Sequence, residues 1–249
     1  MRKRIFRDLC LGSILASISG ISLASGAVLV KAPVEKVFVP QGFDDNDKVE
    51  VIVHGHFTSS CYKMGPVSAI VDDATKKLML SVEAFYYPQA TCLQMLVPYT
   101  KSIEVGRHLT AGIYKVEVLG SPQARSIPLN VVHATRPEAD DFLYAAAYSA
   151  LLEQTSEGKQ EIVLKGQHPY LFDGCVRFED IKSYVGADNV LVVQPITKIV
   201  YGEACATGNN PLNKFEERKT LNSNLLKGEY LMHVRVLDGN SINQFVEIE

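Results

Sequence analysis

The chain has 249 residues, of which 47% are apolar, 21% charged and 8% aromatic, and it contains no tryptophan. This composition is typical of globular protein and excludes collagen-like, low-complexity and disordered classes. After the first 27 positions no uncharged apolar run reaches the roughly 18 residues of a membrane-spanning helix. We therefore expect no membrane span in the mature protein.

The N-terminal segment has the pattern of a secretory signal peptide. Four basic residues within the first seven positions precede an apolar stretch from Leu9 to Ala24, and small residues follow up to Ala27. This order predicts a signal peptide over residues 1–27, cleaved after Ala24 or Ala27, and a periplasmic or secreted mature protein. An uncleaved anchor helix is the alternative, although the apolar stretch is short for a span.

The net charge is −3 and becomes more negative when the basic N-terminal segment is removed. A mildly acidic chain without a basic run has no electrostatic footprint for phosphate backbones or anionic lipid surfaces. Nucleic acid is therefore excluded as a predicted partner.

The rest of the chain resembles itself. Apolar segments at 49–55 and 160–166 are each followed by two cysteines, 31 positions apart in the first half and 30 in the second. A Leu-x-x-Gly-x-Tyr element then follows at 109–114 and again at 225–230. A period near 110 residues indicates a duplicated domain rather than a solenoid. The predicted domains are residues 28–135 and 142–249.

Short extended segments fill the first repeat. Alternation between Tyr114, Val116 and Val118 on one face and Lys115 and Glu117 on the other predicts a half-buried strand. Turn-forming residues separate such segments, and about seven strands in some 108 residues are typical of a β-sandwich. The predicted strands are 34–39, 49–57, 67–71, 78–84, 102–105, 114–119 and 127–132.

Residues 138–153 allow two interpretations. Pro137 and the acidic residues after it resemble a helix start. The repeat instead aligns 147–152 with 33–38, the first predicted strand. Because tertiary context overrides propensity, we predict a strand here, with residues 134–141 as the linker between domains.

The Leu-x-x-Gly-x-Tyr element suggests a structural role. Gly112 and Gly228 permit a turn with positive φ, and Tyr114 and Tyr230 fit tyrosine corners that bury the ring and return the hydroxyl to nearby backbone. In these features the chain resembles exported bacterial proteins built from tandem immunoglobulin-like or fibronectin-III-like domains. The resemblance covers essentially all of the mature chain. It implies an all-β fold of two tandem immunoglobulin-like β-sandwich domains, although the lack of tryptophan and the cysteine spacing depart from antibody domains.

Four cysteines remain after the signal peptide, and they allow three pairings. The repeat favours Cys61–Cys92 and Cys175–Cys205, one disulfide in each domain. Export to an oxidising compartment makes the oxidised state the expected one. No Cys-x-x-Cys spacing points to redox catalysis or a zinc site.

Two further motifs could bind metal. His54 and His56 lie two apart on a predicted strand and so share a face, but the second repeat has Lys165 and Gln167 there and no third ligand is evident. The acidic run 44–47 lacks the glycine and terminal glutamate of a calcium loop. We therefore predict a solvated hairpin turn at 44–47, and neither a metal nor another cofactor.

Motifs for catalysis are absent from the sequence, including Gly-x-Ser-x-Gly, His-Glu-x-x-His and phosphate-binding glycine loops. We therefore predict no enzyme but an exported binding module for a protein or glycan of the cell envelope. Tyr86 and Tyr87, close to Cys92, are a possible partner surface, but packing in the core is the role that we favour for them.

Two other functions remain alternatives. A pilus-type periplasmic chaperone also uses two immunoglobulin-like domains, but the paired basic residues that would hold a client carboxylate are not evident. An envelope hydrolase or metalloprotein is the second alternative.

Overall fold

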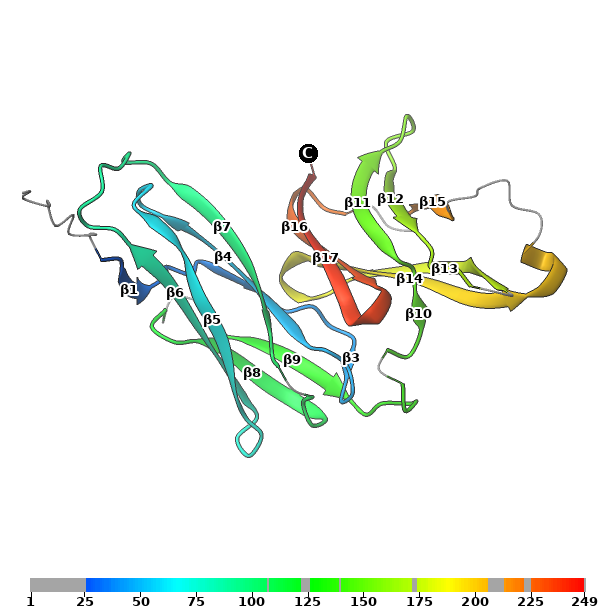
Figure 1. The fold of residues 1–249 in the computed structure, drawn as a ribbon, viewed down its shortest axis with the longest axis horizontal. Helices are drawn as coiled ribbons and strands as arrows, with labels where there is room; N and C mark the ends of the chain where they lie inside the picture. Colours follow the sequence, from blue (N-terminus) through cyan, green and yellow to red (C-terminus); the bar gives the residue numbers. More distant parts are fainter. Residues whose placement is uncertain are drawn as a thin grey trace, which may run out of the picture.

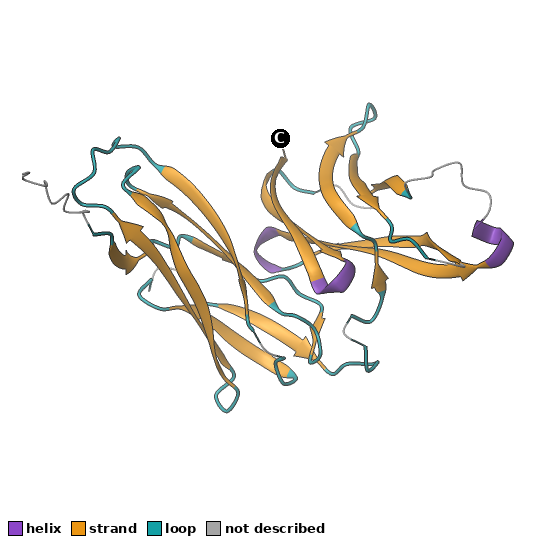
Figure 2. Ribbon diagram, viewed as in Figure 1, coloured by secondary structure: helices purple, strands orange, loops and turns teal. Residues whose placement is uncertain are grey.

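The computed structural model describes residues 26–106, 108–121, 126–138, 140–171, 174–205, 213–221 and 225–248. The predicted signal peptide lies outside these residues except for its last two positions. Strands dominate the described chain, and its only helical elements are the short 3-10 turns η1 (Ala187–Asn189), η2 (Gly202–Cys205) and η3 (Leu237–Gly239) (Figure 2). None of the helices in the described part has the length and apolar character needed to span a bilayer.

The first domain is a sandwich of two sheets (Figure 1). One sheet holds β2, β4 and β7. The other has β5, β6, β8 and β9 in order, with β1 beside the end of β6 and β3 beside β9. The strands are β1 (Val28–Lys31), β2 (Lys36–Phe38), β3 (Phe43–Asp44), β4 (Glu50–Phe57), β5 (Tyr62–Asp72), β6 (Lys77–Tyr86), β7 (Val97–Glu104), β8 (Gly112–Val118) and β9 (Ile127–Val132).

The second domain has the same connectivity, except that its described residues include no counterpart of β3. Its smaller sheet holds β11, β12 and β15, and its larger sheet has β13, β14, β16 and β17 in order, with β10 beside β14. The strands are β10 (Leu143–Tyr144), β11 (Ala147–Gln154), β12 (Gln160–Gln167), β13 (Gly174–Val185), β14 (Val190–Tyr201), β15 (Lys214–Thr220), β16 (Gly228–Val236) and β17 (Asn240–Ile248).

The prediction of two tandem β-sandwich domains, each with one intradomain disulfide, is confirmed. One central pair in each domain is parallel, β6 with β8 and β14 with β16. Immunoglobulin sandwiches are built from antiparallel sheets. The likeness to them therefore lies in the two-layer architecture, and these parallel pairs depart from it.

All seven strands predicted in the first repeat are present, β9 with the predicted bounds and the others with shifted ends, whereas β1 and β3 were not predicted. The strand predicted within residues 138–153 is present as β11, which pairs with β12 along its whole length. The alternative interpretation of this segment as a helix is wrong. This pairing places Ala150 in the core of the second domain. Burial of one face thus outweighs the helical propensity of the alanines.

Each domain has its own apolar core between its two sheets. A third buried cluster lies between the domains and consists of Phe38, Ile52, Val190, Val192 and Leu231, with Phe245 packed against it. These residues come from the outward faces of β2 and β4 and of β14, β16 and β17. The two domains therefore stack face to face, and we call this contact the joint.

The two outermost faces of this stack carry charge. On the first domain Lys115 pairs with Glu117 at 2.5 Å, and Lys31 pairs with Glu83 at 3.0 Å. On the second, Arg218 contacts the carboxylates of Glu153, Glu161 and Glu216 at 2.7 to 3.1 Å. The inner faces carry the buried apolar cluster through which the domains meet.

Candidate functional site

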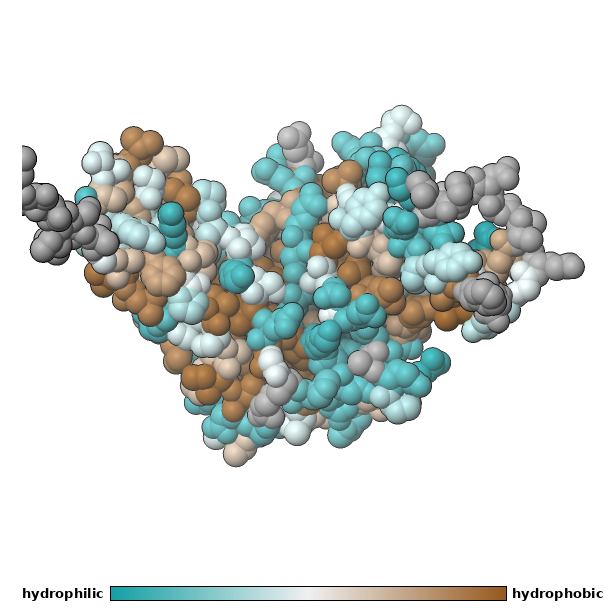
Figure 3. All heavy atoms as spheres, viewed as in Figure 1, coloured by the Kyte–Doolittle hydropathy of each residue, from teal (hydrophilic) through white to brown (hydrophobic). Residues whose placement is uncertain are grey.

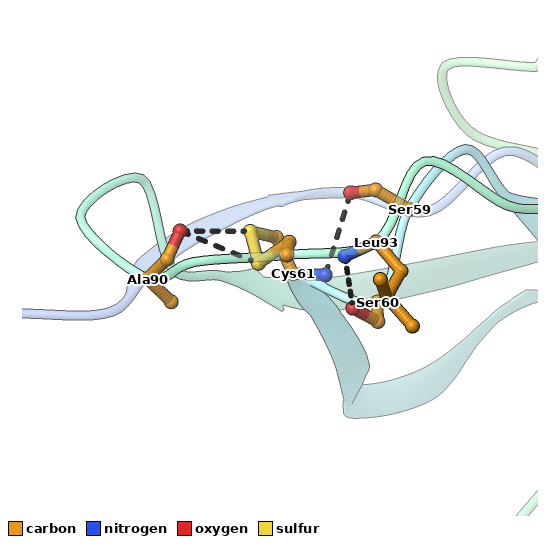
Figure 4. The surroundings of a disulfide bond; sticks show 6 residues. Ser59, Ser60, Cys61, Ala90 and Leu93 are labelled. Carbon is orange, nitrogen blue, oxygen red and sulfur yellow. Dashed lines mark hydrogen bonds between the residues drawn. A yellow bond between two sulfur atoms is a disulfide. The ribbon is translucent and has the colours of Figure 1, made fainter.

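The Cys61–Cys92 disulfide fixes the connection between β6 and β7 (Figure 4). Beside it the amide of Leu93 donates to the Ser60 hydroxyl at 2.9 Å, and the amide of Ser60 donates to the Leu93 carbonyl at 3.1 Å. Both sulfur atoms also lie close to the Ala90 carbonyl oxygen, at 3.5 and 3.6 Å. The backbone of residues 87–96, which we call the clamped loop, is therefore held in one position.

The clamped loop presents aliphatic side chains to solvent. Leu93 is 69% exposed, Leu96 67% and Met95 50%. No charged residue occurs between Ala84 and Thr100. The space-filling view shows apolar side chains on the surface at this end of the first domain (Figure 3). The clamped loop is therefore a fixed, uncharged and apolar projection from the first domain.

Tyr86, which the sequence offered as a possible partner residue, contributes little to this projection. Its ring stacks on Tyr62 with centroids 4.8 Å apart, and Tyr62 stacks on Phe57 at 5.5 Å. Phe57 in turn stacks on Tyr99. Tyr86 is therefore the outer end of an aromatic column that continues into the core.

Tyr87 lies at the base of the clamped loop. Its amide donates to the Cys61 carbonyl at 3.0 Å, and the Lys63 ammonium lies 5.6 Å from its ring centroid. The two tyrosines thus support the loop, while its exposed large apolar side chains are the leucines and methionine that the sequence analysis did not select. The sequence feature that could have identified these exposed residues is the uncharged run after Cys92.

The Cys175–Cys205 disulfide joins the start of β13 to η2. This end of the second domain lies opposite β1 in the molecule (Figure 1). A pocket of about 380 Å³ beside the disulfide is lined by His168, Phe178 and Phe215, among others. His168 stacks on Phe215 at 4.5 Å, and burial lowers the pKa of His168.

Gly112 and Gly228 have φ values of +144° and +145°, in the region that favours glycine. The ring of Tyr114 is fully buried, and that of Tyr230 nearly so. The Tyr114 hydroxyl donates to the Asp73 carboxylate and lies 3.0 Å from the Thr110 hydroxyl. These partners are side chains, whereas the prediction placed this hydroxyl on backbone.

His54 and His56 share a face of β4, with ring centroids 5.1 Å apart. His56 contacts Glu35 at 3.0 Å, and His54 contacts Thr100 at 3.1 Å. Burial and the neighbouring His56 lower the pKa of His54. Within the described ranges no three or more His, Cys, Asp or Glu side chains are grouped so that they could hold a metal ion. His54 instead packs beside Phe245, at the rim of the joint.

The joint contains a buried ion pair. Arg235 Nη1 lies 3.1 Å from Asp47 Oδ2, and both side chains are almost fully buried. Arg235 Nη2 donates to the Gly42 carbonyl at 2.5 Å, and the guanidinium lies 4.5 Å from the Phe43 ring centroid. One arginine of the second domain thus binds the β3–β4 segment of the first by charge, hydrogen bond and ring contact.

The expectation of a solvated turn at 44–47 is therefore wrong, since Asp44 and Asp47 are each 3% exposed. Asp47 Oδ2 accepts a hydrogen bond from the Asp44 amide at 3.0 Å in addition to the contact with Arg235. Burial, the largest cause, and the nearby Asp47 charge raise the pKa of Asp44. The segment is covered by the second domain, which its own sequence does not reveal.

A second polar group in the joint surrounds His233, which is 1% exposed. Its Nδ1 lies 2.8 Å from Asn243 Oδ1 and 3.4 Å from Glu50 Oε1. The Glu50 carboxylate accepts hydrogen bonds from the hydroxyls of Ser102 and Ser241, one from each domain. Burial lowers the pKa of His233, and this outweighs the opposite effect of Glu50.

Polar contacts at the rim complete the joint. The Tyr184 hydroxyl donates to the Gln41 carbonyl at 2.8 Å. Lys36 pairs with Glu229 at 2.6 Å. The joint thus combines an apolar centre, two buried polar groups and an outer ring of weaker contacts, as stable protein interfaces do.

Comparison with family models finds one similarity. Residues 51–129, which run from β4 into β9 of the first domain, match a model described as the ORF11 beta-sandwich domain. This match agrees with the two-sheet architecture of that domain. Comparison with curated proteins and with solved structures finds no match to the chain.

Proposed function

We propose that this chain is exported from the cytosol, loses residues 1–27 as a signal peptide, and acts as a non-catalytic binding protein in the periplasm or outside the cell. Its partner is a protein or glycan of the cell envelope. The two intradomain disulfides support export, because such bonds form and persist in oxidising compartments.

We further propose that the two domains arose by tandem duplication. The connectivity that their sheets share, apart from β3, supports this. So do Gly55 and Gly166, which occupy equivalent positions in β4 and β12. A Cβ atom at Gly55 would lie 2.9 Å from the Tyr99 hydroxyl, and one at Gly166 would lie 2.2 Å from the Phe215 ring. Each glycine makes room for an aromatic side chain of the paired strand.

The observation that carries the binding role is the clamped loop. Interfaces are depleted of charge at their centre, and exposed apolar groups that gather in one place mark contact sites. A loop whose backbone is already fixed loses little conformational entropy on binding. Leu93, Met95 and Leu96 combine these properties.

Affinity capture from the native envelope under non-reducing conditions tests this proposal. The bait is the exported protein, compared with the double variant Leu93→Ser, Leu96→Ser. The control is Leu226→Ser, which changes a leucine of the second domain that is 80% exposed. We expect specific partners to be retained by the control and lost by the double variant. An unchanged set of partners with the double variant would refute the clamped loop as the binding surface.

A further inference from the structure

We propose that the joint is a pH-dependent lock, in which neutral His233 holds the two domains together and its protonation releases them. This goes beyond the proposed binding role, because it concerns the arrangement of the domains and not the clamped loop. The lock lies where the outward faces of β4 and β16 meet.

The hydrogen bonds of His233 fit the neutral side chain. Its Nδ1 donates to Asn243 Oδ1 at 2.8 Å. Its Nε2 is buried and has no hydrogen-bond partner among the described residues. A neutral ring leaves only a lone pair there, whereas a protonated ring would place a charged N–H without an acceptor. Leaving such a group unpaired in a buried site is costly.

The charges around His233 give limited compensation for a proton. Glu50 of β4 lies 3.4 Å away, but its carboxylate is already engaged by Ser102 and Ser241. Arg235, two residues along the same strand, disfavours a second positive charge. The remaining charged groups that line this part of the joint are Asp47 and Lys48 from the segment before β4 and Asp140 from the linker.

The sign of the pH dependence follows from burial. The pKa of His233 is lowered from its ordinary 6.5 in the closed joint, and it returns toward that value when the joint opens. Closure is therefore fully favoured above pH 6.5 and weakens as the pH falls below it. Burial raises the pKa values of Asp44 and Asp140. Protonation of those carboxyl groups favours the closed joint, which is the opposite of the effect of His233. Carboxyl groups titrate at lower pH than histidine, so His233 determines the pH dependence of closure between about pH 5 and 6.5.

Carbodiimide cross-linking measures the closed joint directly. The reagent couples Lys36 to Glu229 across the joint, where the two groups are 2.6 Å apart. It also couples Lys31 to Glu83 within the first domain, at 3.0 Å. The ratio of the two products, measured by mass spectrometry in increasing urea, gives the urea midpoint at which the joint opens. The second product corrects for the effect of pH on the reagent.

We expect the midpoint of the wild-type protein to be lower at pH 5.0 than at pH 7.5, corresponding to a fall of up to about thirtyfold in the closing equilibrium. In His233→Gln, or in His233→Leu if the glutamine variant does not fold, the midpoints at the two pH values should coincide. The control is His54→Gln at the rim, where burial also lowers the histidine pKa; it should keep most of the wild-type response.

Three results would overturn the proposal. The first is equal midpoints for the wild-type protein at both pH values. The second is a shift that persists when His233 is replaced or disappears when His54 is replaced. The third is loss of both cross-links at the same urea concentration, because the joint would then open only as the domains unfold.

Discussion

Arg235 and Asp47 are 188 positions apart in the sequence, yet their side chains form an ion pair of 3.1 Å that is buried between the two domains. Asp47 belongs to the segment that leads into β4, and Arg235 to β16. Each would have to be hydrated if the domains separated. The pair therefore couples the stability of one domain to contact with the other.

Removing the arginine should be strongly destabilising. In Arg235→Met the Asp47 charge stays buried without its partner, and we expect a loss of about 3–5 kcal/mol in the free energy of unfolding. The matched control is Arg218→Met on the outer face, where three carboxylates contact a solvent-exposed guanidinium. The control should have little effect, because water screens exposed pairs. Urea unfolding followed by circular dichroism compares the two, and equal losses would contradict a special role for the joint.

The disulfides should contribute similarly to each domain. Replacing both Cys61 and Cys92 with serine reopens a loop closed at a separation of 31 residues. The chain-entropy model gives a loss of about 3–4 kcal/mol. We expect a comparable loss for Cys175→Ser with Cys205→Ser, where the separation is 30 residues. Chemical unfolding of the oxidised protein and both double variants measures this. Unchanged stability would show that the loops are held by their other contacts.

Gly55 and Gly166 should not tolerate a side chain. A Cβ atom would lie 2.1 Å from the Pro33 carbonyl at the first position and 2.4 Å from the Ala146 carbonyl at the second. Alanine at either should cost about 1–3 kcal/mol through overpacking. Gly186→Ala is the control, because its nearest neighbours are 3.6 Å away. Thermal denaturation distinguishes them, and a melting temperature of Gly55→Ala equal to that of the control would contradict the steric argument.

The N-terminal prediction has a direct test. Expression of the full chain in a bacterium with a periplasm should yield a mature protein that begins at Ser25 or Val28, because the small residues at 22–27 fit a cleavage site. N-terminal sequencing of the exported protein identifies the first residue. An intact Met1 on a membrane-associated product would favour the anchor helix instead.

Much of each separate domain could be predicted from the sequence. Alternation in Tyr114–Val118 identified β8, and the repeated cysteine spacing identified both disulfides. These features depend on residues close in sequence, or on the comparison of one half with the other. β1 and β3 were missed because strands of four and two residues are too short to show a period.

The joint was not predicted, because the sequence indicates it only through a difference between the outward-facing residues of the two repeats. Outward positions of β8 carry Lys115 and Glu117, whereas the equivalent positions of β16 carry Leu231 and His233. A strand that is apolar on both faces is covered on both. Comparing the outward residues of the two repeats would have shown that the second repeat has a partner on this face. The acidic turn at 44–47 gave no such signal, because the residues that bury it lie in the other domain.

The ion pairs on the outer faces make those parts of the surface costly to cover. Lys115 and Glu117 form an ion pair on one outer face, and Arg218 forms ion pairs with its carboxylates on the other. A body placed on either surface would have to remove water from these ions, although the outer sheet of the first domain also exposes Ile70 and Ile113. The loss of hydration of these ions therefore opposes stacking on the outer faces, whereas at the joint the apolar cluster favours contact.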